Sequence, residues 1–308
     1  MSRFFETLKE VSRSQLLPSE PLPDSRPEEK SAPGPDRIQV PDLANFPVSA
    51  AALPEAPALT EIPLERQDRR DRSASPEPGG FRETTIDTKL DRKIPLIPHT
   101  LDNSVVEQYR RLRTKIQQQH AKQPIHSLLV ASPGQGEGKT VTTFNLALSF
   151  AMLPSTRVLI VDGDLRRGTV SKWLNVRDMP GISNVLEGSA CLEDTIFKTE
   201  DLPMHFLFGG TSTKSPAELL NSAMLPQVMR RLCENFDLVL VDSPPVNLIA
   251  DAQMLAGSCD GVLLVARAFK TTNKAFQKMM RDLLPFRIVG TVLNGGMRTP
   301  LYSRYYNY

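Results

Sequence analysis

The chain has 308 residues, with 37 Lys and Arg against 35 Asp and Glu and a formal net charge of +2. This balance excludes the broad basic field that a surface for nucleic acid or anionic lipid would need. The three cysteines are odd in number and form no CxxC pair. They argue against a disulfide scaffold or a zinc site and for a reducing compartment. No segment is apolar over the roughly 18 residues of a membrane span, and the polar first residues do not resemble a signal peptide. We therefore expect a soluble protein whose membrane contact, if any, is indirect or peripheral.

Proline divides the chain, because 15 of its 26 prolines fall in the first 100 residues. Residues 1–16 carry apolar side chains at helical spacing and predict a short amphipathic helix. It is a functionless end, a docking helix for another protein or a lipid contact, and its sequence does not decide between these. Residues 17–92 are rich in Pro, Glu, Ser and Ala and predict a disordered linker.

Residues 93–298 predict a folded domain. A helix from Asp102 or Ser104 to about Ala121 precedes short apolar runs that alternate with helical ones. The predicted strands are 126–132, 157–161, 204–208, 237–241, 261–266 and 287–293. The predicted helices are 140–153, 225–236, 250–258 and 272–284. This alternation predicts an α/β fold with a mainly parallel sheet covered by helices on both faces, and with ligands at the carboxyl ends of the strands.

A glycine-rich segment, SPGQGEGKT at 132–140, joins the first of these strands to the next helix. Glycines let the backbone approach phosphate, a helix N-terminus favours anions, Lys139 can reach the β and γ oxygens, and Thr140 offers a hydroxyl to Mg²⁺. Pro133 stands where the strict phosphate-loop pattern has glycine, so we expect the outer part of the loop to run differently. The predicted nucleotide-binding residues here are Gly134, Gln135, Gly136, Glu137, Gly138, Lys139 and Thr140.

Acidic side chains follow two other predicted strands. Asp162 and Asp164 end the second strand, and Asp242 ends the strand that includes residues 238–241. Like charges this close are costly unless a cation lies beside them, and Mg²⁺ is the cation that suits carboxylates near phosphate. Each acid could instead cap a solvated turn. Together with the phosphate loop they predict ATP and Mg²⁺ as ligands, with Thr140, Asp164 and Asp242 at the metal.

Four of the five tyrosines lie in the last seven residues of the chain. The surrounding segment, 299–308, is polar and offers little apolar company, so it predicts an exposed tail that accepts phosphate. The alternative is a C-terminal strand that docks its rings on the domain. The predicted acceptors are Tyr302, Tyr305, Tyr306 and Tyr308.

The blocks LLVASPGQGEGKTVTTFNLALSFA, VLIVDGDLRRG and FDLVLVDSPPV resemble the Walker A, A′ and B blocks of the bacterial tyrosine kinases that accompany exopolysaccharide synthesis. The resemblance covers about residues 90–308. It includes Glu107, Arg110 and Arg113, which match that family's ExxRxxR oligomerisation motif. The sequence departs from the family at Gly168, where relatives usually have proline.

The resemblance implies an ATP-dependent protein-tyrosine kinase that phosphorylates its own C-terminal tyrosines between neighbouring subunits and regulates exopolysaccharide polymerisation and export. In that scheme Lys139 stabilises charge on the transferred group, and Asp162 accepts or orients the proton of the phenol. Asp164 binds the metal and Asp242 orients its water shell. Asn294, at the end of the last strand, is expected to contact the adenine.

The partners implied are a second copy of the chain, a separate transmembrane polysaccharide co-polymerase as activator, and a protein-tyrosine phosphatase, with no nucleic acid. The location implied is cytoplasmic, at the inner face of the plasma membrane through that partner. Two alternatives stay open. An ATPase switch of the MinD and ParA kind would carry a signature lysine at the position of Gly134. A catalytically inactive regulatory subunit is disfavoured by the intact carboxylates.

Overall fold

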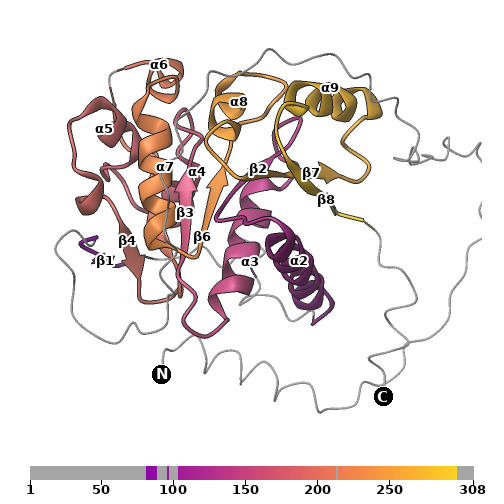
Figure 1. Ribbon diagram of the computed structural model, residues 1–308, viewed down its shortest axis with the longest axis horizontal. Helices are drawn as coiled ribbons and strands as arrows, with labels where there is room; N and C mark the ends of the chain where they lie inside the picture. The colour runs from indigo at the N-terminus through magenta and orange to yellow at the C-terminus, as the bar shows by residue number, and fades with distance from the viewer. Residues whose placement is uncertain (1–80, 89–95, 97–102, 213, 297–308) are drawn as a thin grey trace, which may run out of the picture. The chain divides into compact units, whose positions relative to one another are not determined.

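The computed structural model describes residues 81–88, 96, 103–212 and 214–296 (Figure 1). The helix predicted over residues 1–16, most of the predicted linker and the tyrosine tail lie outside the described residues. Within the described ranges, no helix is long and apolar enough to cross a membrane.

An eight-stranded sheet forms the centre of the fold, in the order β1-β4-β5-β3-β6-β2-β7-β8. Neighbouring strands are parallel except for the antiparallel pair β4 and β5. The strands are β1 Thr84–Ile86, β2 Ser127–Ala131, β3 Val158–Asp162, β4 Phe197–Thr199, β5 His205–Leu207, β6 Leu238–Asp242, β7 Gly261–Arg267 and β8 Ile288–Asn294. The predicted mainly parallel sheet is confirmed.

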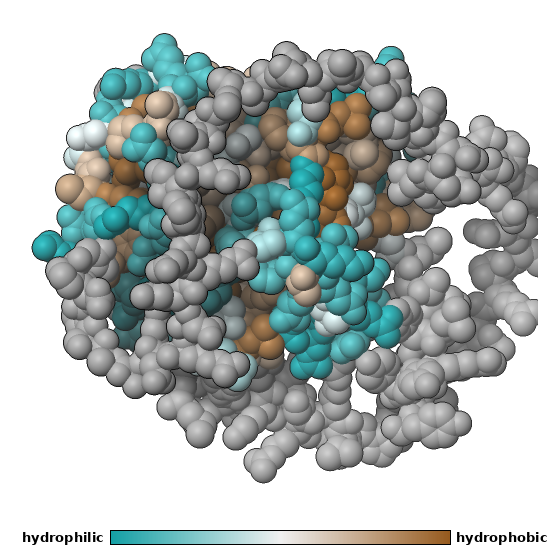
Figure 2. Space-filling view, viewed as in Figure 1, coloured by the Kyte–Doolittle hydropathy of each residue, from teal (hydrophilic) through white to brown (hydrophobic). Residues whose placement is uncertain are grey.

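Helices cover both faces of this sheet, as predicted. They are α2 Asn103–Lys122, α3 Lys139–Ala151, α4 Thr169–Trp173, α5 Ile182–Glu187, α6 Pro216–Leu220, α7 Met224–Asn235, α8 Asp251–Ala256 and α9 Asn273–Leu283. Side chains alternate along each strand, so Leu128 packs into the core under α2, α3 and α4, whereas Leu129 packs into the core under α5 to α9. Both leucines are fully buried. The outward surface of α2 is mainly hydrophilic (Figure 2).

The predicted linker over residues 17–92 is wrong at its C-terminal end, because β1 lies within it. This three-residue strand pairs in parallel with β4 at the edge of the sheet. The Glu83 carboxylate beside it lies 2.6 Å from Arg157, 3.1 Å from His205 and 3.5 Å from Lys198. These partners are distant in sequence, so local composition gives no sign of the strand. The folded region therefore begins before residue 93.

The carboxyl ends of the central strands bring the predicted site together. Strands β3 and β6 are neighbours, and their last residues, Asp162 and Asp242, are partners in the register. Strand β2 lies between β6 and β7 and leads into the glycine-rich segment. Both acids and the glycine-rich segment therefore lie together at the carboxyl ends of the central strands.

Candidate active site

The phosphate loop connects β2 to α3, and its conformation depends on glycine. Gly136 and Gly138 have φ values of +67° and +98°, in the left-handed region that other residues rarely adopt. A Cβ atom on Gly138 would lie 2.1 Å from Nδ2 of Asn294, so a side chain at this position would displace the Asn294 amide. A hydrogen bond within the loop holds its outer part: the Gly134 N–H donates to the Glu137 carboxylate at 3.2 Å.

Lys139 begins α3 and is 8% exposed. Its Nζ donates to Ser132 Oγ at 3.1 Å and to the Gly134 carbonyl at 3.4 Å, both in the phosphate loop. Burial lowers the pKa of Lys139, and the charges of Asp242 and Asp164 oppose that shift. Since both hydrogen-bond partners are neutral, an anion in the loop would be a stronger partner for the ammonium group.

Asp242 and Asp164 fit a divalent cation. Thr140 Oγ1 donates to Asp242 Oδ2 at 2.6 Å, whereas Asp242 Oδ1 is buried and has no hydrogen-bond partner among the residues described. Burial raises the pKa of Asp242 to about 6 and also raises the pKa of Asp164. No three His, Cys, Asp or Glu side chains of the described chain could hold a metal by themselves. Mg²⁺ commonly takes only one or two carboxylates and fills its other positions with phosphate and water, so these residues suit it.

Asp162 is fully buried, and both of its carboxylate oxygens are already hydrogen-bonded. They accept the backbone N–H groups of Asp164 at 3.2 Å and of Val170 at 3.0 Å. Burial, together with the charge of Asp242, raises its pKa well above the ordinary value. In this conformation Asp162 fixes the loop after β3, and a phenol reaches it only if that loop opens. Its role as proton acceptor stays a prediction.

Asn294 lies against the phosphate loop. Its Nδ2 donates to the carbonyls of Glu137 and Gly138, at 3.2 and 3.3 Å, and to Thr142 Oγ1 at 3.2 Å. These contacts fix the start of α3. The predicted contact with adenine stays a prediction.

Three cations near the loop were not predicted from the sequence. Arg167, in the loop after β3, donates to the side-chain oxygen of Gln135 at 2.7 Å. Arg267, the last residue of β7, and Lys270, in the loop that follows it, donate to the carbonyls of Gly136 at 2.9 Å and Gln135 at 2.6 Å. Each lies at or soon after the end of a strand, which is the one signal in the sequence that could have indicated it.

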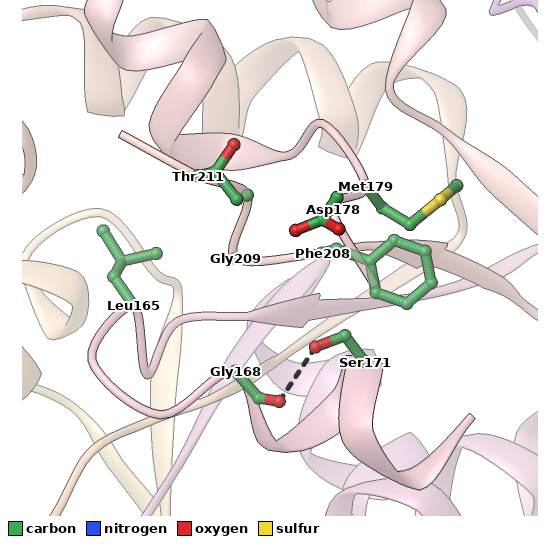
Figure 3. Close-up of a pocket in the computed structure, with 9 residues that line it drawn as sticks. Leu165, Gly168, Ser171, Asp178, Met179, Phe208, Gly209 and Thr211 are labelled. Atoms are coloured by element: carbon green, nitrogen blue, oxygen red, sulfur yellow. Dashed lines mark hydrogen bonds between the residues drawn. The ribbon is translucent and has the colours of Figure 1, made fainter. Parts of the chain in front are cut away.

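A small pocket of about 80 Å³ lies where the loops after β3 and β5 meet (Figure 3). Leu165, Met179 and Phe208 contribute apolar walls, and the Ser171 hydroxyl donates to the Gly168 carbonyl at 2.9 Å. None of the residues predicted for phosphate or metal lines this pocket.

The motif predicted for oligomerisation lies on α2, but its three residues do not share one surface. Glu107 forms ion pairs within the chain, at 3.5 Å to the exposed Arg110 and 3.9 Å to Arg111. Arg113 points inward and donates to the Ser149 carbonyl of α3. Glu107 and Arg110 therefore pair with each other at the surface of α2, whereas Arg113 holds α2 on α3.

Comparisons with known proteins identify the family of the chain. Residues 128–284 match the AAA domain family model AAA_31. The chain is similar to tyrosine-protein kinase YwqD of Bacillus subtilis, with 32% identity over 61% of this chain and 80% of that protein. It is 30% identical to the putative tyrosine-protein kinase CapB of Staphylococcus aureus, over 70% of this chain and 94% of that protein. The kinase domain of Escherichia coli tyrosine kinase ETK aligns with a TM-score of 0.59 and 29% identity, over 63% of this chain and 77% of that domain. The chain therefore belongs to the bacterial tyrosine-protein kinase family and has that family's P-loop nucleotide-binding fold.

Proposed function

We propose that the protein is an ATP-dependent protein-tyrosine kinase whose acceptors are the tyrosines of its own C-terminal tail. One observation supports this proposal most strongly: Lys139, Asp164 and the hydrogen bond from Thr140 to Asp242 lie together at the carboxyl ends of the central strands. The chain that carries them belongs to a tyrosine-kinase family. The choice of acceptor rests on the sequence of the tail. The proposed acceptors are Tyr302, Tyr305, Tyr306 and Tyr308.

The order of the strands supports a direction for the nucleotide. Asp162 and Asp242 end β3 and β6, on one side of the phosphate loop, and β7 and β8 lie on the other side. Because Mg²⁺ and the transferred phosphate belong near the acids, the γ-phosphate lies towards β3 and β6 and the nucleoside towards β7 and β8. The acceptor tyrosine then approaches from the side of β3 and β5, where the pocket beside Leu165 lies.

Phosphoryl transfer needs alignment and charge neutralisation more than covalent chemistry. Bound Mg²⁺ supplies positive charge at the phosphate oxygens, and Thr140, Asp164 and Asp242 would hold it. Lys139 supplies further positive charge through its Nζ. A neutral tyrosine, with a pKa of about 10, is a weak nucleophile, so the proposal assigns Asp162 to accept or orient its proton.

The test is where the γ-phosphate goes. Purified protein is incubated with Mg²⁺ and γ-labelled ATP, and label on tyrosine is compared with label released as inorganic phosphate. We expect label on tyrosine, located in the tail by mass spectrometry. Release of phosphate without phosphotyrosine would instead identify an ATPase switch, and no turnover of either kind would identify an inactive regulatory subunit.

The proposal includes assembly of the chain with itself through α2. Replacing the exposed Arg110 by Ala should shift the mass distribution measured by light scattering towards smaller assemblies, because an acidic side chain of the neighbouring subunit would lose its ion-pair partner. Replacing Arg113 by Ala should instead lower the unfolding free energy by about 1 kcal/mol, since its bond to the Ser149 carbonyl is within the chain. An unchanged mass distribution for the Arg110 variant, where the wild type assembles, would contradict the assignment.

By resemblance, we propose that a separate transmembrane polysaccharide co-polymerase activates the kinase and that a protein-tyrosine phosphatase resets it. The kinase would then act in the cytoplasm, at the inner face of the plasma membrane, in the control of exopolysaccharide export. In this scheme residues 1–16 form a helix, the following segment links it to the kinase domain, and residues 299–308 are the acceptor tail.

A further inference from the structure

Besides Lys139 and Lys172, which donates to the Arg167 carbonyl, four arginine and lysine side chains surround the phosphate loop and the loop after β3 in the described chain. Three of these four are held by a carboxylate or by main-chain carbonyls. Arg166 forms a bidentate contact with Asp251, at 2.9 and 3.4 Å, and Asp251 is 3% exposed. Arg267 and Lys270 donate to main-chain carbonyls of the phosphate loop. The N–H groups of such a loop bind phosphate, so cations that contact its carbonyls stabilise the loop from the side that faces away from the phosphate. Arg167 is the fourth.

Arg167 bridges the two loops that flank the predicted phosphate site. It belongs to the loop that carries Asp164, and its Nη2 donates to the side-chain oxygen of Gln135, in the phosphate loop, at 2.7 Å. Among the residues described, it forms no ion pair with a carboxylate. Gln135 offers only a neutral amide oxygen, which a charged phosphate oxygen would outcompete for a guanidinium group.

The charge of Arg167 acts on both residues that flank the transferred group. Burial raises the pKa of Asp164, and the charges of Lys139 and Arg167 oppose that shift. Burial lowers the pKa of Lys139, and Arg167 contributes to the same shift. The guanidinium group is therefore close to the place where Lys139 and a metal at Asp164 would meet phosphate.

The backbone holds Arg167 in a fixed turn. The N–H groups of Arg167 and Gly168 both donate to the Asp164 carbonyl at 3.0 Å. Gly168 has a φ of +55°, in the left-handed region that glycine adopts readily and proline cannot. The Lys172 ammonium group donates to the Arg167 carbonyl. These hydrogen bonds set the turn in the absence of nucleotide.

We propose that Arg167 is a catalytic residue that donates to the γ-phosphoryl group in the transition state. During transfer the bond from the γ-phosphorus to the bridging oxygen breaks, and its electron pair leaves with ADP. The acceptor oxygen forms the new bond to phosphorus and gives up its proton to a carboxylate. Negative charge is then spread over the bridging and equatorial oxygens, where an arginine can donate two hydrogen bonds. Arg167 would supply a second positive charge, beside that of Lys139, from the same chain. In an ATPase of the MinD and ParA kind a signature lysine would stand at position 134, where this chain has glycine. This inference rests on the proposed transfer from ATP but not on the identity of the acceptor.

The direct test measures binding of Mg²⁺ and a fluorescent ADP, with and without aluminium fluoride, which mimics the phosphoryl group in transfer. Arg167→Ala should leave the affinity for ADP within about threefold of wild type. The factor by which aluminium fluoride increases ADP affinity should be at least about tenfold smaller in this variant than in the wild type. Its kcat should fall by about 10²- to 10³-fold with little change in KM for ATP, and Arg167→Lys should recover part of that loss. The exposed Arg177 has no hydrogen bond or ion pair in the described chain, so Arg177→Ala is the control.

An equal effect of aluminium fluoride on wild type and Arg167→Ala, whether large or absent, would overturn the proposal. A role limited to bracing the phosphate loop through Gln135 would make Gln135→Ala lose as much kcat as Arg167→Ala. We expect the Arg167 variant to lose much more. If the protein releases phosphate and forms no phosphotyrosine, the proposed kinase function fails, and the same comparisons made on phosphate release still decide the role of Arg167.

Discussion

Replacing Lys139 by Met is expected to reduce phosphotyrosine formation at least about a thousandfold while leaving the protein folded. Among the residues described, the hydrogen bonds of the buried ammonium group go to Ser132 Oγ and the Gly134 carbonyl, and Met fills a similar volume without a charge. The loss therefore falls on the phosphoryl group, whose developing charge loses its nearest cation. Phosphotyrosine is measured by mass spectrometry, and folding by circular dichroism and thermal unfolding.

The matched control is Lys278→Met, because Lys278 is an exposed lysine of α9 that pairs with Asp282 at 2.8 Å. This variant should keep wild-type transfer. Phosphotyrosine at the wild-type level in Lys139→Met would show that the phosphate loop is not the site of transfer.

Replacing Asp242 by Asn should raise the stability of the nucleotide-free protein and reduce transfer about a hundredfold or more. In the folded protein burial raises the pKa of Asp242 from 3.8 to about 6. A carboxyl group whose pKa is raised by folding makes the folded state less stable as pH rises from about 4 to 6, and the cost then stays constant. That cost is on the order of 2–3 kcal/mol at pH 7.5. An amide has no charge to desolvate, but it also cannot balance Mg²⁺.

The measurement is urea unfolding without nucleotide at pH 7.5 and at pH 4. We expect the Asn variant to be more stable than wild type by about 1–2 kcal/mol at pH 7.5, with part of the gain lost to the unpaired amide. Near pH 4 the carboxyl group of the wild type is neutral and only the cost of the unpaired amide remains, so the Asn variant should be less stable than wild type by about 1 kcal/mol. The exposed Asp201 gives the control substitution Asp201→Asn. A less stable Asp242 variant at pH 7.5 would show that this carboxylate serves the fold rather than the metal.

The central strands and the phosphate loop could be predicted because their signals are local. Strands β2, β3 and β6 consist mainly of Val, Leu and Ile and are buried along their whole length. Each was expected within one or two residues of its observed bounds. Acids at the ends of parallel strands must meet at one edge of the sheet, so the sequence pattern is sufficient to place Asp162 and Asp242 together.

What the sequence could not show depends on contacts between distant residues. Strands β1 and β4 have three residues each and form through pairing at the sheet edge. The spacing of Glu107, Arg110 and Arg113 places them along one helix but does not say which of them faces α3. The bridge from Arg167 to Gln135 joins two loops 32 residues apart, and only the folded chain brings them together.

The central claim is that this site phosphorylates the tail of a second copy of the chain, and mixing two inactive variants tests it directly. One variant is Lys139→Met, which keeps the tail but lacks the lysine. The other has an intact site but has Phe at positions 302, 305, 306 and 308. Neither should form phosphotyrosine alone with Mg²⁺ and ATP, and the mixture should place phosphate on the tail of the Lys139 variant. Phosphotyrosine in the Phe variant alone would contradict the claim for the tail, and an unlabelled mixture beside a labelled wild type would contradict transfer between copies.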